Sequence, residues 1–182
     1  MAQPRAHMKV KLIIGMLSRF PELLDRAGKL LEKDFGPVSH RSEIIPFNFS
    51  DYYESEMGAG LLRSFLAFER LVDAGTLAAI KLRTNSIEQE LAGPQWPVAR
   101  PINVDPGYLD LSKLILASAK DYAHRIYLGQ GIYAEVTLTF KDGALRSMPW
   151  TYPDYRSEAY LHFFEKVRAD FHRAVRVVTD ST

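Results

Sequence analysis

The chain has 182 residues, of which 47% are hydrophobic and 25% charged, and this composition is typical of a single globular domain. A formal net charge of +1 gives no general attraction to nucleic acid or to anionic membranes, so neither is an expected partner. The chain contains no cysteine, which excludes disulfides, thiolate metal ligands and cysteine nucleophiles, and suits the reducing cytoplasm.

The two ends of the chain differ from its middle. Residues 1–8 are polar and lack the apolar segment of a signal peptide, so we expect a disordered tail there. Residues 177–182 are expected to be a frayed tail at the other end. No apolar run is long enough to span a bilayer. Residues 9–176 are therefore expected to form a single α+β domain.

The spacing of apolar residues predicts a β-α-β-β-α-β order for the first half of the chain. Residues 9–18 are a nearly continuous apolar run, typical of a central strand covered on both faces, and a helix follows from Pro21 to Gly36. Further strands are predicted over 42–49, 61–72 and 102–109, with a second helix over 76–91. This order is the ferredoxin-like, or split βαβ, arrangement.

The second half is predicted to extend that core. Residues 111–122 have helical apolar spacing after Asp110, a potential N-cap, and predict a short helix. A β-hairpin over 124–140 and a strand over 144–150 would then form a three-stranded meander. A long C-terminal helix is expected after Pro153, because aromatic and aliphatic residues recur there at helical spacing.

The predicted hairpin has an unusually polar face. A three-residue loop, Gly129–Gly131, keeps the apolar faces of its two strands together. The expected cross-strand pairs are Leu128–Ile132, Ile126–Ala134, Tyr127–Tyr133 and Arg125–Glu135. Two interpretations stay open, namely a solvated surface with one ion pair and the floor of a polar pocket.

Familiar catalytic and nucleotide-binding motifs are missing. The sequence contains no phosphate-binding P-loop, no Gly-x-Gly-x-x-Gly after a strand, no His-Glu-x-x-His and no Gly-x-Ser-x-Gly. Its five histidines do not have the spacing of metal ligands. No metal site is therefore predicted, no cofactor can be named, and no motif decides whether the protein is an enzyme.

Three residues are candidates for acid–base chemistry. His124 lies between Lys120 and the hairpin, and a neighbouring carboxylate, either Asp105 or Glu135, would suit it to proton transfer. The alternative is a partly buried histidine at a strand end. The Asp105-Pro106-Gly107 segment has two readings as well, an ordinary turn or a carboxylate presented at a strand end. We take His124, Asp105 and Glu135 as the catalytic candidates.

Cationic, polar and aromatic side chains elsewhere could form a binding site. Lysine and arginine supply donors to anions, carboxylates can take a proton or a hard cation, and tyrosine rings can stack on a planar ligand. The candidate ligand-binding residues are Arg125, Lys120, Lys113, Tyr127, Tyr133, Tyr52, Tyr53, Glu56, Lys81, Asn85, Asn103, Tyr108 and Arg156.

Four motifs give the chain a resemblance to a known family. They are Tyr52-Tyr53 with Glu56-Met57-Gly58, Lys81 with Thr84-Asn85 and Glu88, Arg100-Pro101 with Asn103 and Asp105-Pro106-Gly107-Tyr108, and His124–Leu128 with Gly131–Glu135. They resemble an uncharacterised bacterial family, a domain of unknown function, over most of the chain from about residue 9 to residue 171. Members are sometimes labelled GTP-binding, although this chain has no Walker loop. The resemblance supplies no catalytic residues.

Two functions remain in view. The first is a site for a small anionic or nucleotide-like ligand, with or without catalysis. The second is a non-catalytic binding or dimerisation module that uses an aromatic face of the sheet and implies a homodimer. The aromatic residues expected on that face are Tyr127, Tyr133, Trp150, Tyr152 and Tyr155. RNA binding by such a face would require a basic excess that the chain lacks.

Overall fold

The computed structural model describes residues 3–179, without the side chains of residues 177–179. The predicted tails therefore fall partly outside the described residues. Residues 3–8 are described and contain no helix or strand. At the other end, the backbone of the last helix continues to residue 179. Among the described residues, no helix combines the length and apolar character needed to cross a membrane.

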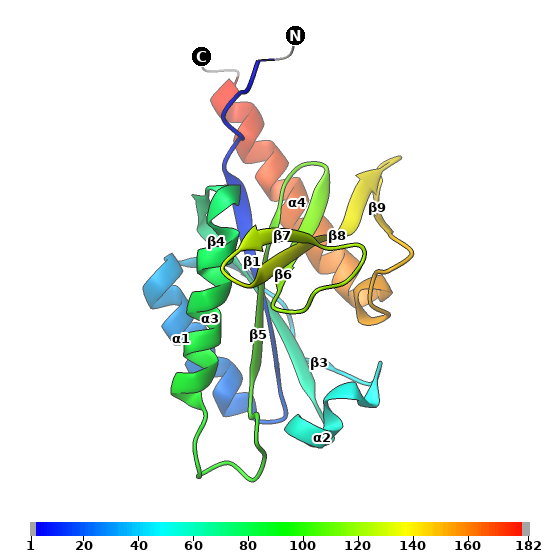
Figure 1. Ribbon diagram of the computed structural model, residues 1–182. Coiled ribbons are helices and arrows are strands. Elements are labelled where there is room, and N and C mark those ends of the chain that lie inside the picture. Colours follow the sequence, from blue (N-terminus) through cyan, green and yellow to red (C-terminus); the bar gives the residue numbers. More distant parts are fainter. Residues whose placement is uncertain (1–2, 180–182) are drawn as a thin grey trace.

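The elements of the first half follow the predicted order, with short additions (Figure 1). They are β1 (Val10–Ser18), α1 (Pro21–Phe35), β2 (Val38–Arg41), β3 (Ile45–Pro46), α2 (Glu54–Met57), β4 (Leu62–Val72), α3 (Leu77–Leu91) and β5 (Asn103–Leu109). The strand predicted over 42–49 is displaced, because pairing with β4 occurs in two short segments, β2 and β3, on either side of residues 42–44.

In the described part of the second half there are four strands and one α-helix. They are β6 (Lys113–Ser118), β7 (Ile126–Gly129), β8 (Ile132–Lys141), β9 (Ala144–Ser147) and α4 (Glu158–Thr179). The order of the sheet is β2-β4-β1-β5-β6-β8-β7, with β3 paired to β4 and β9 paired to β8. All of its strand pairs are antiparallel. The α+β class predicted from the sequence is therefore confirmed.

Apolar side chains on the two faces of the sheet form separate cores. Leu12, Ile14 and Met16 of β1 pack with α1 and α3, whereas Ile13 packs with Phe65 of β4 and with α4. All nine residues of β1 are buried, which confirms the prediction of a central strand covered on both faces. Figure 1 shows α1 and α3 side by side, with α4 behind the sheet.

The short helix predicted over 111–122 is wrong, because this segment contains strand β6. Leu114 and Leu116 face the core beneath α4, and Ile115 and Ala117 face a third cluster with Leu77 of α3. A strand buried on both sides has no polar alternation, so its apolar run matched a helical pattern by coincidence. Asp110, expected as a helix cap, accepts from the backbone N–H groups of Ser112 and Lys113 in the turn before β6.

The predicted meander is also only partly present. Both hairpins exist, but β7 and β9 pair with the same edge of β8, near its opposite ends. The other edge of β8 pairs with β6, along residues Tyr133 to Thr139. The prediction failed because β6 was taken for a helix, which left β8 without its long neighbour.

The predicted register of the β7–β8 hairpin is confirmed for two pairs. Ile126 lies opposite Ala134, and Tyr127 lies opposite Tyr133 with their ring centroids 5.1 Å apart. The Leu128–Ile132 pair is wrong, since Gly129 pairs with Ile132 after a bulge. The loop therefore has two residues, Gln130 and Gly131, both with positive φ (56° and 75°), and the bulge restores the phase that a two-residue loop would have lost.

Candidate functional site

The sheet opens between β5 and β6. The two strands pair only from Gly107 to Leu109 of β5, and they part at the next residue, Pro106. Proline has no N–H to donate, so the ladder toward β6 cannot continue through it. The Asp105-Pro106-Gly107 segment is therefore strand and not a turn, and the turn interpretation is wrong.

Where the two strands separate, side chains of helix α3 replace β6 as the hydrogen-bonding partners of β5. The backbone N–H of Val104 donates to Glu88 Oε1 at 2.7 Å, and its carbonyl accepts from Lys81 Nζ at 3.0 Å. A buried strand edge must satisfy its polar groups in some way, and here two charged side chains do so in place of a neighbouring strand. The opening is therefore a defined part of the fold, because the strand edge beside it is hydrogen-bonded.

A cavity of about 760 Å³ occupies this opening, within the range of small-molecule sites. Its walls come from β5, α3, the end of β6, the segment around η1 (Asp51–Tyr53), and the loop before η3 (Asp154–Arg156). Nine candidates named from the sequence line it: Asp105, Glu135, Arg125, Lys120, Tyr52, Tyr53, Lys81, Asn85 and Asn103. The structure therefore brings together residues that are far apart in the chain.

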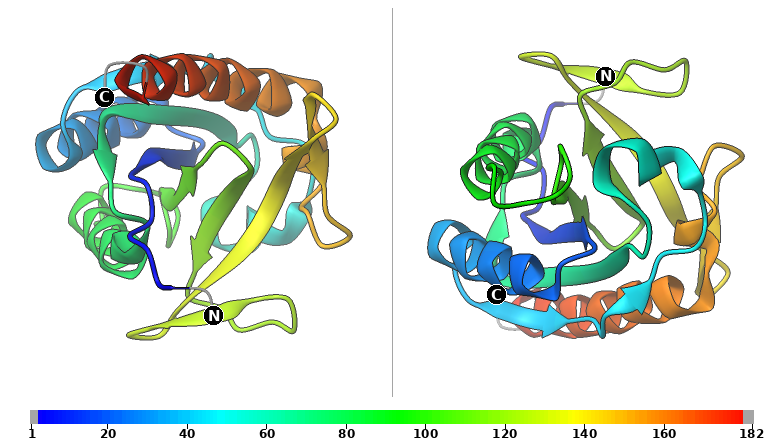
Figure 2. Two further views of the ribbon diagram at one scale, coloured as in Figure 1. Left: turned by 90° about the horizontal axis from the view of Figure 1, so that it is seen from above. Right: turned by 90° about the horizontal axis from the view of Figure 1, so that it is seen from below.

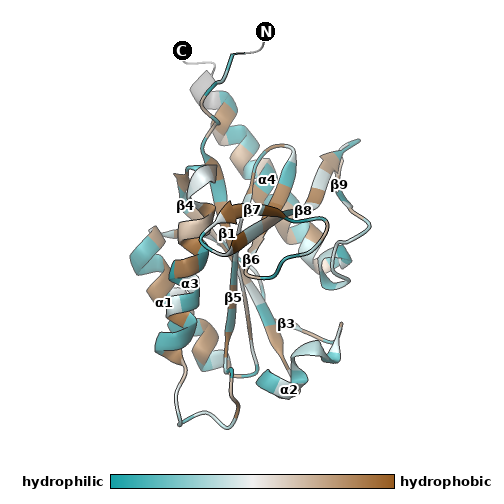
Figure 3. Cartoon of the chain, in the orientation of Figure 1, coloured by the Kyte–Doolittle hydropathy of each residue, from teal (hydrophilic) through white to brown (hydrophobic). Residues whose placement is uncertain are grey.

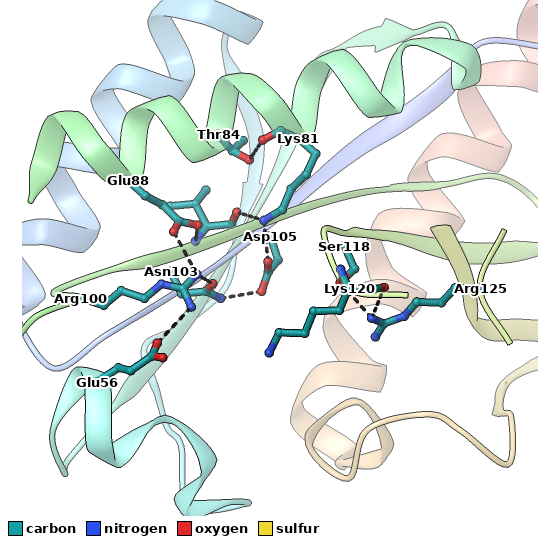
Figure 4. A network of polar contacts seen from close by, with 11 residues as sticks. Glu56, Lys81, Thr84, Glu88, Arg100, Asn103, Asp105, Ser118, Lys120 and Arg125 are labelled. Atoms are coloured by element: carbon teal, nitrogen blue, oxygen red, sulfur yellow. Dashed lines mark hydrogen bonds and ion pairs between the residues drawn. The ribbon is translucent and has the colours of Figure 1, made fainter. Parts of the chain in front are cut away.

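Asp105 is held by two donors from the same side of the cavity. It accepts from Lys81 Nζ at 2.9 Å and from Asn103 Nδ2 at 2.5 Å (Figure 4). Burial by itself raises the pKa of Asp105, but the charge and hydrogen bond of Lys81 and the charge of Arg63 lower it to about 2. Asp105 is therefore ionised across the physiological range and acts as an acceptor.

The network continues from Asp105 toward the mouth of the cavity. Arg100 Nη2 donates to Glu88 at 2.9 Å and also to the side-chain oxygen of Asn103, and Arg100 Nη1 lies 3.8 Å from Glu56 (Figure 4). Burial raises the pKa of Glu88, against the lowering effect of Lys81 and Arg100. Glu56 belongs to this network at its outer end but does not line the cavity.

Arg125 and Glu135 form the predicted pair on the opposite wall. Arg125 Nε donates to Glu135 at 2.8 Å, and both side chains are nearly inaccessible, at 3% and 2% exposed. The other nitrogens of Arg125 donate to Ser118 Oγ, the Lys120 carbonyl and the Tyr152 hydroxyl. Most N–H groups of Arg125 are therefore already hydrogen-bonded to the protein. We infer that Arg125 holds the end of β6 in place.

His124 lies behind this pair and not in the cavity lining. Its Nε2 lies 3.1 Å from Glu135, and its ring is stacked between Tyr122 and Trp150, with centroids at 5.9 and 5.3 Å. This stack joins the 119–125 loop to the 148–152 loop. The geometry supports the partly buried histidine at a strand end, which was one of the two sequence interpretations.

Lys120 is the one cavity-lining cation, among the described residues, that has no carboxylate partner. It donates to the hydroxyl of Tyr52, and its ammonium lies 4.5 Å from the centre of that ring. Tyr52 is 64% exposed, so the pair lies at the mouth. Tyr53, deeper in the wall, has its pKa raised to about 12 by burial and by the charge of Asp105, so its hydroxyl stays neutral.

Five other candidates lie apart from the lining. Lys113 pairs with Asp110 at 2.6 Å, at the far end of β6, and Tyr108 packs against the cluster around Ile115. Arg156 donates to the carbonyls of Met148, Pro149 and Thr151, and thereby braces the loop that ends at the cavity wall. Tyr127 and Tyr133 lie on the hairpin.

Several lining residues were missed from the sequence. Arg63 is 3% exposed, its Nη2 lies 3.4 Å from Asp154, and its Nε and Nη1 have no hydrogen-bond partner in the described part of the chain. The Arg63 guanidinium lies 5.5 Å from the centre of the Phe47 ring, and this cation–π contact partly stabilises the buried positive charge. The available signal was that Arg63, near the start of β4, precedes the apolar run of that strand. Burial raises the pKa of Asp154 more than Arg63 lowers it.

The fold and site define an antiparallel α+β domain with a charged cavity at a split in its sheet. Residues 8–171 match the family described as Domain of unknown function (DUF4416), and the chain therefore belongs to that family, as the sequence motifs predicted. No curated protein and no solved structure matches the chain.

Proposed function

We propose that the cavity binds a small anionic ligand and that Lys120 contacts its anionic group. The carrying observation is the distribution of charge among the lining residues. Arg63, Lys81, Arg100 and Arg125 each have a carboxylate within ion-pair distance. Within residues 3–179, the Lys120 ammonium has only the Tyr52 hydroxyl as a partner, so its charge is available to an incoming anion.

The catalytic candidates fit binding better than acid–base catalysis. A carboxylate with a pKa of about 2, such as Asp105, is a weak base at neutral pH, because general bases work best with a pKa near the operating pH. Glu135 accepts from Arg125, His124 and Thr137, so its oxygens are occupied. We therefore assign Asp105 to ligand recognition, and Glu135 and His124 to support of the wall.

Replacing Lys120 by methionine tests the proposed anion site. We expect binding of inorganic phosphate, pyrophosphate or nucleotides, measured by calorimetry, to weaken about tenfold, because one charge-assisted contact is lost. Lys113→Met is the matched control, since Lys113 begins the same strand outside the cavity and should leave the affinity unchanged. Equal affinities for wild type and the Lys120 variant would refute the assignment.

We also propose that the first half of the domain is a ferredoxin-like split βαβ core within one domain of residues 9–176. The strand order β2-β4-β1-β5 supports this, because β4 lies between β1 and β2 and is antiparallel to both. The ligand site would then be a feature of the extension, since it forms where β6 departs from β5.

The exposed apolar surface of the β7 hairpin supports a second candidate function, self-association. Ile126, Tyr127 and Leu128 are 70%, 59% and 42% exposed, and β7 ends the order of the sheet. Figure 2 shows this hairpin standing out from the body of the molecule, and Figure 3 shows apolar residues along it. The aromatic face expected from the sequence is smaller, because Tyr155 lies in the core beneath α4.

Ile126→Lys tests this second function. If β7 joins two copies edge to edge, we expect the variant to be monomeric under conditions where the wild type is dimeric, because a charged edge opposes strand pairing. Light scattering coupled to gel filtration measures the mass of both proteins. A wild type that stays monomeric at high protein concentration would remove dimerisation as a function of the hairpin.

A further inference from the structure

The cavity contains polar groups that the folded chain leaves unused. Asn85 and Gln89 lie one turn apart on α3, line the cavity, and have no hydrogen-bond partner in their side chains among the described residues. Thr84 and Glu88, on the same helix, are both engaged, with the Lys81 carbonyl and with Val104 and Arg100. Each amide offers a donor and an acceptor at one position.

Asp105 adds a fixed acceptor beside these amides. Its carboxylate is held by Lys81 and Asn103, while the side chain is still 27% exposed. An ionised carboxylate can only accept hydrogen bonds, so a group that fills this position must donate one. Tyr53, at the neighbouring wall, offers a hydroxyl that can donate or accept.

The surrounding charges restrict what that group can be. Lys81 and Arg63 both act on the Asp105 carboxylate, so its charge is already balanced and gives a ligand ammonium little attraction. A second anion would meet Asp105, Glu88 and Asp154 in the lining of the same cavity. Neutral groups that both donate and accept fit best, and neighbouring hydroxyls have this property.

We infer that the cavity recognises a polyhydroxylated anion, whose hydroxyl groups bind Asp105, Asn85 and Gln89 while its anionic group lies at Lys120. This inference rests on the proposed anion site. A free sugar phosphate and the ribose phosphate of a nucleotide both present this chemistry. Tyr52 and Tyr53 line the same cavity, and an aromatic ring there can cover the less polar side of such a ligand.

Calorimetry with matched probes tests the inference. We expect ribose 5-phosphate or a nucleoside monophosphate to bind at least about tenfold more tightly than inorganic phosphate, since hydroxyl contacts are added to the same anion contact. Asn85→Leu and Gln89→Leu should remove most of that advantage. Lys120→Met should instead weaken all probes by a similar factor. Ser86→Ala, on the same helix but outside the cavity lining, should leave both affinities unchanged.

The outcomes separate this inference from the proposed function. If inorganic phosphate binds through Lys120 but sugars add no affinity, the anion site stands and the hydroxyl site is refuted. If Asn85→Leu weakens inorganic phosphate as much as ribose 5-phosphate, Asn85 contacts the anion and the inference fails. Failure of every probe to bind overturns both. Tighter binding of ribose 5-phosphate than of nucleoside monophosphates, lost in the α3 variants, would identify a free sugar phosphate as the source.

Discussion

Replacing Lys81 by methionine is expected to lower the free energy of unfolding at pH 7 by about 3–5 kcal/mol, which is the usual cost of removing one partner of a buried ion pair. Lys81 is 5% exposed, and its Nζ serves both Asp105 and the Val104 carbonyl. The substitution therefore leaves a carboxylate without its main counter-charge and a strand carbonyl without its donor. Methionine keeps the helix propensity and most of the volume of lysine, so the loss is mainly electrostatic.

The loss of stability caused by Lys81→Met should depend on pH in a defined direction. In the wild type the pKa of Asp105 is about 2, below its usual 3.8, so its stabilising contribution is present above pH 3.8 and is lost as the pH falls toward 2. Without Lys81, the two largest causes that lower the pKa of Asp105 are lost, so this pKa rises. The penalty in the variant is therefore largest at neutral pH and decreases as Asp105 becomes protonated in acid.

Urea unfolding of both proteins between pH 3 and pH 7 measures this deficit. Arg83→Met is the matched control, because Arg83 lies on the same helix but forms its ion pairs with Asp34 and Glu90 at the surface. That change should cost less than about 1 kcal/mol. The double variant Lys81→Met/Asp105→Asn should recover much of the loss at pH 7. A Lys81 variant as stable as the Arg83 variant would mean that the Lys81 contacts do not hold the open strand edge.

The β7–β8 hairpin was predicted well because one apolar face decides its pattern. The register of the β7–β8 hairpin followed from keeping its apolar sides aligned, and the Arg125–Glu135 pair followed from the register. Strand β6 was misread because both of its faces are buried, so its sequence carries no alternation. The error at β6 then produced the error in the meander, since β8 was left without its partner.

The sequence named several residues that line the cavity, but it did not indicate where the cavity lies. Lysine, arginine and aspartate are types of residue that bind ligands, which made Lys81, Asp105, Lys120 and Arg125 candidates. The residue types did not indicate the gap between β5 and β6 that brings these side chains together. That gap depends on where β5 and β6 stop pairing, which requires the partner of β5 to be known. Arg63 was overlooked for a related reason, because a charged residue near the end of a strand gains significance only when the neighbouring strands are placed.

The three residue pairs that join β5 to β6 depend on Gly107. A Cβ atom at this position would lie 2.2 Å from the Ile115 carbonyl oxygen and 2.7 Å from Leu116 Cδ2. Backbone cannot move aside as a side chain can, so alanine must push the two strands apart. The glycine is thus required by the close approach of the strands immediately before they part around the cavity.

Gly107→Ala is expected to lower the free energy of unfolding by about 3 kcal/mol, at the upper end of the usual cost of overpacking. Gly28→Ala provides the control, because a Cβ there meets only the flexible end of Arg41, at 3.1 Å, within helix α1. Alanine in that helix should be neutral or stabilising by up to about 1 kcal/mol. Hydrogen exchange locates the effect, since the amides of the β5–β6 pairs should lose protection first. If Gly107→Ala unfolds at the wild-type urea concentration, the two strands are not held as closely as this contact requires, and the cavity between them would not have a fixed width.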